Sequence, residues 1–283
     1  MVWRLVNMLL LLMAWSVNLI VLSPWLIALG IINRLTARRY HRWLMRSMYA
    51  IYHRWCLNNN LLFDLFLPTQ WLVQGQGVLD KHRDYIVVLN HRSWLDILVI
   101  MKVFVPKLPI VKFFLKKSLV FLPFLGQVCW ALDYPFINRQ GKHQQDKTDQ
   151  VLKQLSSIEK GLPMAMVIFP EGTRFRSQKP GGTLQNCLPP RCLGLAKLLQ
   201  ATADRQPLLL DVTLHYSSSN LLAFFTGTLE KITVDYQVSE LDPSWYGDYA
   251  KDRAFRQVFK DKVNTLWQQK DQRYQQIDLS VDA

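Results

Sequence analysis

The sequence predicts an α/β fold, in which helices cover a mixed sheet, preceded by a helical segment that anchors the protein to a membrane. Short apolar runs of strand length alternate with longer stretches of helical spacing, which is typical of this fold class. Two polar clusters, residues 90–96 and 169–174, each follow an apolar run directly. The first 63 residues contain no Asp or Glu and include a long uncharged stretch.

The N-terminal stretch from Leu5 to Ile32 is uncharged and long enough to cross a bilayer as a helix. A cluster of arginines between Arg34 and Arg46 follows at once, which places that side of the membrane in the cytoplasm and predicts the cell inner membrane as the location. A cleaved signal peptide is disfavoured, because the apolar stretch is too long and its downstream side too basic.

Ser23-Pro24 could bend this stretch, so it could also enter the bilayer and return without crossing. Residues 43–67 are apolar but carry charges, and we expect them to lie at the membrane interface. Residues 1–67 are therefore predicted to form a membrane anchor of one or two helices.

From residue 68 onward the pattern changes to that of a catalytic domain, predicted to extend to residue 245. The predicted strands are Trp71–Gln74, Tyr85–Leu89, Phe136–Asn138, Met164–Phe169, Leu208–Leu214 and Leu221–Phe225. The predicted helices are Trp94–Phe104, Val111–Leu119, Asp146–Lys160 and Arg191–Ala203. Residues 246–283 are expected to form a docked amphipathic helix, from Asp252 to Tyr274, and a tail.

The net charge of +13 predicts an anionic partner. The basic residues are interleaved with Leu, Phe and Trp, and no zinc-finger, basic-zipper or RNP signature is present, which favours a membrane surface over nucleic acid. Lys112, Lys116 and Lys117 are expected on a helix face that meets either the anionic leaflet or solvent. The four cysteines form no Cys-x-x-Cys pair and are expected to be unpaired thiols in a reducing compartment.

The cluster Asn90-His91-Arg92-Ser93-Trp94-Leu95-Asp96 supplies a candidate general base. Five residues apart on one helix, His91 and Asp96 would point about 140° from each other. Ser93 and Asp96, however, have the spacing of a capping box, which would place His91 in the loop before the helix and Asp96 within its reach. The alternative is that Asp96 only caps the helix, and a lone His-x4-Asp pattern favours that alternative.

The sequence near these residues offers no nucleophile, since it contains no Gly-x-Ser-x-Gly elbow and no obvious reactive cysteine. A base without a protein nucleophile can still activate the hydroxyl of a substrate. The chemistry would then be direct transfer of an acyl group to a substrate alcohol.

The second cluster, Phe169-Pro170-Glu171-Gly172-Thr173-Arg174, combines a carboxylate, a flexible backbone, a hydroxyl and a guanidinium. Arginine binds phosphate in a bidentate manner, and glycine lets the backbone approach a ligand. A surface turn with an ion pair is an equally good interpretation of the cluster alone. Arg139 follows another predicted strand and is a third candidate ligand for phosphate, although a solvated surface arginine is the simpler interpretation.

Together, Asn-His-Arg-Ser-Trp-Leu-Asp, Phe-Ile-Asn-Arg and Phe-Pro-Glu-Gly-Thr-Arg resemble the motifs of the 1-acylglycerol-3-phosphate O-acyltransferase (PlsC-like) family of glycerolipid acyltransferases, and within it the YihG-type bacterial branch. The resemblance implies the mixed sheet of the glycerol-phosphate acyltransferase fold. It implies that His91 is the general base and Asp96 its partner. It also implies that Glu171, Gly172, Thr173 and Arg174, with Arg139, bind the glycerol phosphate of the acceptor.

The resemblance further implies that a fatty acyl group is transferred from acyl-CoA or acyl-carrier protein to lysophosphatidate, without a metal or a cofactor. The sequence departs from the family pattern at Asp133-Tyr134, where the family has a glycine. Two alternatives remain at this point: a different lysophospholipid acceptor, or a catalytically silent lipid-binding membrane protein. The sequence does not indicate an oligomeric state.

Overall fold

The structure, a computed structural model, describes residues 2–137, 162–176, 183–218 and 220–281. Its centre is a six-stranded sheet of order β1-β8-β7-β2-β6-β3. The strands are β1 (Gln70–Gln76), β2 (Tyr85–Leu89), β3 (Ile110–Phe113), β6 (Met164–Ile168), β7 (Leu208–Tyr216) and β8 (Lys231–Ser239). β7 and β8 pair antiparallel and the other neighbours pair parallel, so the predicted mixed sheet is confirmed.

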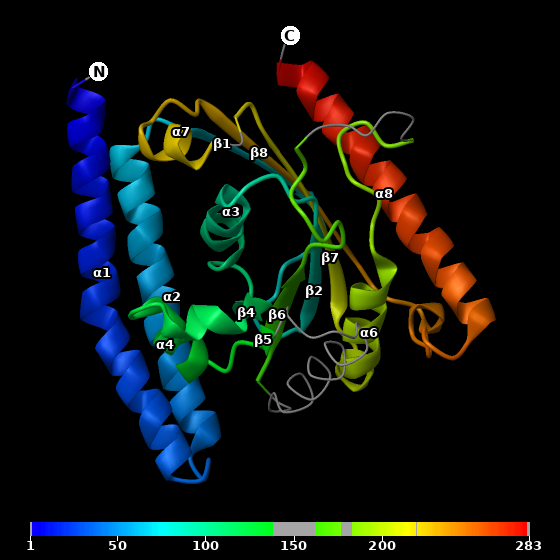
Figure 1. Cartoon of the computed structure of the whole chain (residues 1–283), viewed down its shortest axis with the longest axis horizontal. Coiled ribbons are helices and arrows are strands. Elements are labelled where there is room, and N and C mark those ends of the chain that lie inside the picture. Colours follow the sequence, from blue (N-terminus) through cyan, green and yellow to red (C-terminus); the bar gives the residue numbers. More distant parts are fainter. Residues whose placement is uncertain (1, 138–161, 177–182, 219, 282–283) are drawn as a thin grey trace.

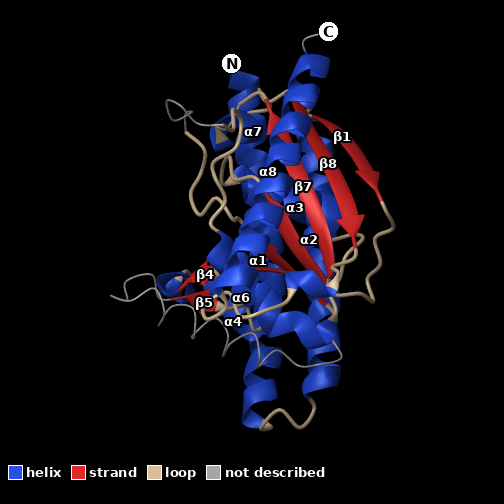
Figure 2. Ribbon diagram, turned by 90° about the vertical axis from the view of Figure 1, so that its right-hand side faces the viewer, coloured by secondary structure: helices blue, strands red, loops and turns tan. Residues whose placement is uncertain are grey.

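Helices cover both faces of this sheet (Figures 1 and 2). On one side lie α1 (Val2–Leu35), α2 (His41–Phe66) and α3 (Leu95–Phe104), and on the other lie α6 (Cys192–Thr202) and α8 (Arg253–Val281). Strands buried on both faces are expected to be apolar along their whole length, and all five residues of β2 are buried. This is why β2 and β6 were recognisable from sequence.

The two N-terminal helices form an antiparallel pair that packs against the rest of the protein (Figure 1). Asn18 on α1 donates to Asn59 Oδ1 of α2 at 2.7 Å and to the carbonyl of Trp55 at 3.0 Å. α1 continues past Pro24, so the predicted bend does not interrupt the helix. Among the described helices, α1 is the one that could cross a membrane, judged only by its length and apolar composition.

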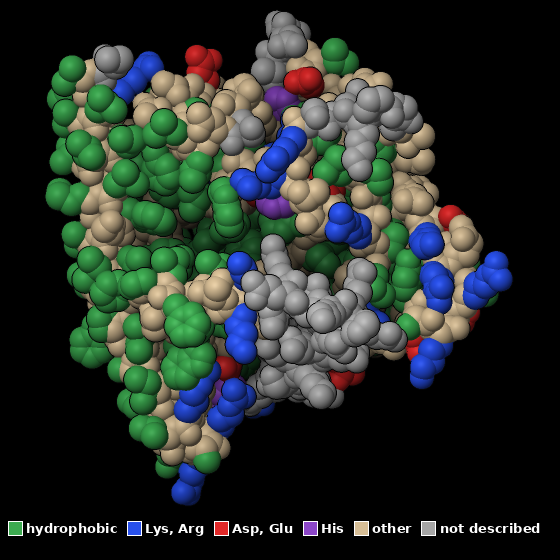
Figure 3. Space-filling model, in the orientation of Figure 1, with side chains coloured by type: hydrophobic (Ala, Val, Ile, Leu, Met, Phe, Trp, Pro, Cys, Tyr) green, Lys and Arg blue, Asp and Glu red, His purple; other side chains and the backbone are tan. Residues whose placement is uncertain are grey.

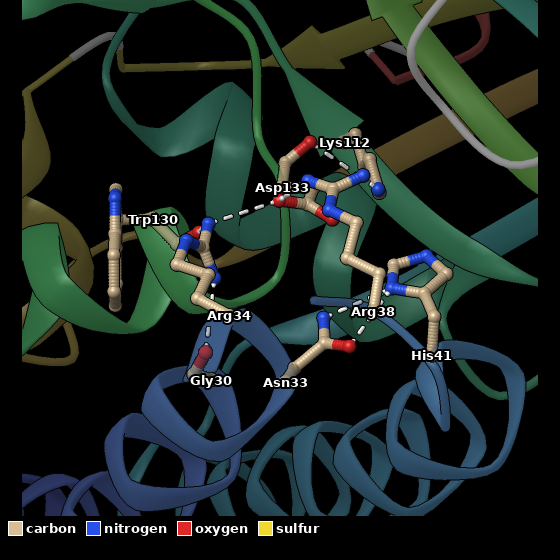
Figure 4. A network of polar contacts seen from close by, with 8 residues as sticks. All are labelled: Gly30, Asn33, Arg34, Arg38, His41, Lys112, Trp130 and Asp133. Atoms are coloured by element: carbon tan, nitrogen blue, oxygen red, sulfur yellow. Dashed lines mark hydrogen bonds and ion pairs between the residues drawn. The ribbon is translucent and has the colours of Figure 1, made fainter. Parts of the chain in front are cut away.

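A polar network fastens the end of α1 to α4 (Leu125–Ala131) and its following turn (Figure 4). Arg34 donates to Asp133 Oδ1 at 3.0 Å and to the carbonyl of Trp130 at 2.9 Å, and its guanidinium lies 3.6 Å from the centre of the Trp130 ring. Arg38 adds a second ion pair with Asp133 at 3.3 Å. Asp133 thus ties the N-terminal helices to the domain that carries the sheet.

The stretch of residues 111–119 is not a helix, and that prediction was wrong. It contains the end of β3, the short strand β4 (Leu115–Lys116) and the beginning of the 3-10 helix η1 (Lys117–Phe121). Lys112 is fully buried on β3, where it donates to the carbonyl of Asp133 at 3.4 Å, and burial lowers its pKa to about 8. Lys112 therefore meets neither a lipid leaflet nor solvent, whereas Lys116 and Lys117 are exposed.

The stretch Leu221–Phe225 is also not a strand but the short helix α7, in which the side chain of Asn220 accepts from the backbone N–H of Leu222 at 2.9 Å. β8 was missed, because its polar residues hide a pattern that alternates only in part. β5 (Phe136–Ile137) pairs with β4 in a separate two-stranded sheet. The predicted helix Asp146–Lys160 lies outside the described residues.

A group of buried charges joins α8 to the sheet. Lys270 is fully buried and donates to Asp211 Oδ1 and to the carbonyl of Val212, both on β7. Arg273 bonds the other oxygen of Asp211 and lies 3.0 Å from Asp235 Oδ1 on β8. Two carboxylates and two cations therefore compensate each other beneath the C-terminal helix.

We expect Lys270→Ala to destabilise the protein by about 3–5 kcal/mol, because removing one partner leaves Asp211 buried with a single cation. Denaturant unfolding in detergent, followed by circular dichroism, measures the loss. Lys262→Ala is the matched control, since Lys262 on the same helix pairs with the exposed Asp242 at 3.3 Å and its loss should change little. Equal stability of the two variants would contradict the role given to the buried charges.

Candidate active site

The two polar clusters meet at one edge of the sheet. β2 and β6 are parallel neighbours, so the loops that follow them leave from the same side, where α/β proteins place their ligands. The backbone N–H of Phe175 donates to the carbonyl of His91 at 2.7 Å and joins the two loops directly. Asn90 fixes the first loop to β7 through two bonds with the backbone of Leu214, at 2.8 and 2.9 Å.

His91 and Asp96 are in contact, with 2.7 Å between Nδ1 of the imidazole and Oδ2 of the carboxylate. Asp96 Oδ2 also accepts from the backbone N–H groups of Arg92 at 2.8 Å and Ser93 at 3.1 Å, while Ser93 Oγ accepts from the N–H of Leu95 at 3.2 Å. The bond from the N–H of Ser93 to Asp96 is half of the expected capping box, whereas Ser93 Oγ accepts from Leu95 and not from Asp96, and α3 itself begins at Leu95. The capping residues thus bring the two side chains together.

This arrangement leaves one imidazole nitrogen free for proton transfer. Asp96 is fully buried, so its carboxylate holds the Nδ1–H and directs Nε2 away from it. The His91 side chain is 20% exposed, and its ring packs on Phe169 with 4.1 Å between ring centres. A group of this kind can act as a general base toward a substrate that enters from the open side.

Tyr216 is a member of the site that the sequence did not reveal. Its hydroxyl donates to Asp96 Oδ1 from the end of β7, 120 positions along the chain. Burial and the neighbouring Asp96 carboxylate raise the pKa of Tyr216, so the phenol keeps its proton. No short motif joins Tyr216 to the first cluster, and only its place at a strand end could have indicated it.

Glu171 is buried rather than presented at the surface, and it forms no ion pair with Arg174. Its carboxylate faces the backbone N–H groups of His91 and Leu188 and the indole of Trp267, and none of these contacts has full hydrogen-bond geometry. Burial raises the pKa of Glu171 to about 8. A neutral carboxyl group beside the loop of His91 can donate or accept a hydrogen bond when a ligand arrives.

The residues that follow Glu171 in the second cluster lie at or near the surface. Gly172 and Thr173 are exposed, and Gly172 has φ of +71°, a conformation that favours glycine. A Cβ there would also lie 3.1 Å from Cδ of Arg191. Arg174 is half-buried, with its guanidinium 5.3 Å from the centre of the Trp94 ring. Arg139 lies outside the described residues.

An apolar cavity of about 480 Å³ begins beside these residues. One face of α3 lines it with Ile97, Leu98 and Met101, and Trp94 precedes them on the same side. α1, α2, α4, α7 and the β3–η1 segment supply the other walls. The helix whose start holds Asp96 against His91 therefore also forms a wall of the cavity. Among the described residues no group of three or more His, Cys, Asp or Glu could hold a metal ion.

Comparison with known proteins identifies the family of this chain. Residues 70–225 match the family model described as Acyltransferase, which covers more than half of the chain. The protein therefore belongs to the Acyltransferase family.

The match to individual relatives is confined to parts of the chain. The chain is 35% identical over 110 residues to the 1-acyl-sn-glycerol-3-phosphate acyltransferase of Saccharomyces cerevisiae, and the match covers 39% of this chain and 34% of that protein. It is 32% identical over 119 residues to an uncharacterised acyltransferase of Schizosaccharomyces pombe, covering 42% of this chain and 40% of that protein. For the mouse 1-acyl-sn-glycerol-3-phosphate acyltransferase epsilon the identity is 26% over 200 residues, covering 65% and 53%. The chain thus spans about half or less of these relatives.

The fold as a whole also resembles a solved structure. The 1-acyl-sn-glycerophosphate (LPA) acyltransferase PlsC from Thermotoga maritima aligns with a TM-score of 0.53 and 19% identity, covering 94% of this chain and 96% of that one. This similarity extends over the N-terminal helices and α8 as well as the sheet.

The raised pKa of Glu171 has a consequence for stability. The buried carboxyl stays neutral up to about pH 8, whereas in the unfolded chain it ionises near pH 4.5. The unfolded state therefore binds fewer protons between these values, and Glu171 makes stability fall as the pH rises through this window.

We expect Glu171→Gln to remove this slope and to leave the variant more stable than the native protein at pH 8, by an amount on the order of a few kcal/mol, with little difference near pH 4.5. Thermal unfolding across this range checks it, and Glu230→Gln, at an exposed carboxylate, is the control. Parallel pH curves for the native protein and Glu171→Gln would show that Glu171 is ionised in the folded state.

Proposed function

We propose that this protein is a membrane-bound 1-acyl-sn-glycerol-3-phosphate acyltransferase, which moves a fatty acyl group from acyl-CoA or acyl-carrier protein to the free hydroxyl of lysophosphatidate and forms phosphatidate. The observation that carries the proposal concerns one helix, α3. Its first turn holds Asp96 against His91, and one of its faces lines a large apolar cavity. The names of the yeast and mouse relatives support the acceptor. The YihG-type bacterial branch stays a prediction from the motifs.

The reaction follows from the position of His91. Nε2 removes the proton from the acceptor hydroxyl, whose oxygen attacks the thioester carbonyl carbon. The tetrahedral intermediate collapses, the carbon–sulfur bond breaks, and the thiolate takes the proton from the imidazolium. Asp96 stabilises the imidazolium between these two steps. No covalent enzyme intermediate and no metal enters this sequence.

The cavity is suited to a fatty acyl chain. Its volume of about 480 Å³ lies within the usual range for small-molecule sites, and its walls are almost wholly apolar. Each methylene that leaves water contributes about 0.8 kcal/mol, so ten methylenes would supply about 8 kcal/mol. Arg174 is half-buried on the ring of Trp94, which lines this cavity, and this contact supports Arg174 as a proposed ligand of the acceptor's phosphate together with Arg139.

The surface of the protein supports attachment to one leaflet of the cell inner membrane. Apolar side chains cover the face that α1 presents, and basic side chains lie along the border of this face (Figure 3). The large exposed apolar residues of α1 are Val2, Trp3, Leu5, Val6, Leu9, Leu10, Met13, Val17, Ile20, Val21, Trp25, Ile31, Ile32 and Leu35. Trp43, Phe121 and Leu122 extend the apolar surface beyond α1.

The packing of α1 favours an in-plane anchor over a spanning one. α1 contacts α2 and α4, and its polar Asn18 is bonded to Asn59, so the helix belongs to the folded body rather than standing apart from it. An amphipathic surface of this kind enters the interface, with the exposed Arg39, Arg42 and Arg46 at the level of anionic head groups. The arginines favour the cytoplasmic leaflet.

We expect His91→Ala to lower thioester-dependent acylation of lysophosphatidate by about 10²–10⁴-fold, because the general base is lost. The assay uses protein in detergent or in membranes that contain it, a labelled acyl thioester and a panel of lysolipid head groups. His82→Ala, at an exposed histidine, is the control. A preference for another head group would change the acceptor, and near-full activity of His91→Ala would exclude the mechanism. Native protein that consumes no thioester would be a silent lipid-binding protein.

We expect Cys129→Phe to shift the preferred acyl donor toward shorter chains, since Cys129 lines the cavity and a phenyl ring would fill part of it. The measurement is kcat/KM for donors of increasing chain length. Val258→Phe, at an exposed position of α8, is the control for the added ring. An unchanged chain-length profile for Cys129→Phe would place the acyl chain elsewhere.

A further inference from the structure

We propose that Tyr216 is a positioning residue of the acyltransferase site, which acts on His91 through the carboxylate of Asp96. The expected kinetic effects rest on the proposed function, whereas the contacts of Tyr216 do not depend on it. Tyr216 is buried, with 4% of its surface exposed, and its hydroxyl donates to Asp96 Oδ1.

The two oxygens of Asp96 share the backbone N–H of Ser93, at 3.1 and 3.2 Å, and otherwise have different partners. Oδ2 accepts from His91 Nδ1 at 2.7 Å and from the backbone N–H of Arg92 at 2.8 Å. Oδ1 accepts from Tyr216 and, at 3.2 Å, from the backbone N–H of Ser93. The donors on Oδ2 all come from the catalytic loop itself, so Tyr216 is the side chain that holds Asp96 from outside this loop.

Tyr216 is itself held in place by its neighbours at the end of β7. Nε2 of the preceding residue, His215, donates to Asp278 Oδ1 of α8 at 2.9 Å, and the His215 ring packs on Tyr274 with 4.8 Å between centres. Arg92 bonds the hydroxyl of the same Tyr274 at 2.6 Å. The catalytic loop and the end of β7 therefore share α8 as a common support.

The hydrogen bond from Tyr216 to Oδ1 also affects the relative stability of the neutral and the protonated form of the His91–Asp96 pair. The hydrogen bond from Tyr216 stabilises the carboxylate most when the imidazole beside it is neutral, since the imidazolium already compensates the charge. Without the phenol hydroxyl, the protonated form of the His91–Asp96 pair becomes relatively more favourable. The charged and titratable groups that face the pair are Arg92 on the same loop, Tyr274 on α8 and Glu171 after β6.

The test is Tyr216→Phe, which removes one oxygen and keeps the ring. We expect kcat to fall about tenfold to a hundredfold, less than the loss of the base itself, with KM for both substrates within twofold of the native value. We expect the acidic midpoint of the pH–rate profile to move upward by about half a unit to one unit. Tyr85→Phe is the matched control, because Tyr85 is a fully buried tyrosine at the opposite end of β2 whose oxygen accepts one backbone bond at 2.8 Å.

A double-mutant cycle shows whether Tyr216 acts through Asp96. In an Asp96→Ala background the change Tyr216→Phe should cost less than twofold, because there is no carboxylate left to position. The same fold-loss in both backgrounds would overturn the proposal, as would native kcat and an unmoved midpoint in Tyr216→Phe alone.

Nuclear magnetic resonance of protein labelled at histidine Cε1 separates this proposal from the proposed function. Among the six histidines, the His91 signal is assigned by its loss in His91→Ala. We expect its titration midpoint to move upward in Tyr216→Phe and to stay in place in Tyr85→Phe. An unmoved midpoint would overturn the role of Tyr216 even if acyl transfer is confirmed. A moved midpoint in protein that transfers no acyl group would refute the function and retain the positioning role.

Discussion

The carboxylate of Asp96 is the point on which the architecture of the site depends. It is fully buried, so its charge has to be compensated by donors within the protein. Those donors come from the loop after β2 and from the end of β7, and β2 and β7 are neighbouring strands. Their register therefore sets the geometry of the imidazole, and a shift of either strand would leave a buried charge without partners. A stable protein and a correctly oriented base are two results of the same constraint.

A second cluster of buried charges attaches α8 to the sheet. Lys270 and Arg273 attach this helix to β7 and β8, and Asp271, which lies between them in the helix, accepts from the backbone N–H groups of residues 185–187. The carbonyl of Asn186 in that segment accepts in turn from Arg92. The C-terminal helix thus reaches the loop that carries His91 and Asp96 through hydrogen bonds.

The elements that could be predicted from sequence were those whose signal is local. β2 and β6 are unbroken apolar runs, and the His91–Asp96 contact followed from capping residues three positions apart. Where the signal depends on distant partners, prediction failed. Lys112 is buried because Asp133 and the N-terminal helices enclose it, and nothing adjacent in the chain indicates this. Tyr216 meets Asp96 only through strand order. β8 was missed because its polar residues interrupt the alternation of buried and exposed positions.

The wall of the apolar cavity is built in part from α1, whose Leu12, Trp15, Leu19 and Leu22 line it. The part of the chain that would hold the protein on the membrane is therefore the same part that would measure the acyl chain. Shortening the N-terminus to obtain a water-soluble enzyme would open the cavity to solvent and remove its selectivity. Conversely, the choice of fatty acid could be redesigned by changing the inner face of the anchor, without altering any residue of the catalytic loops.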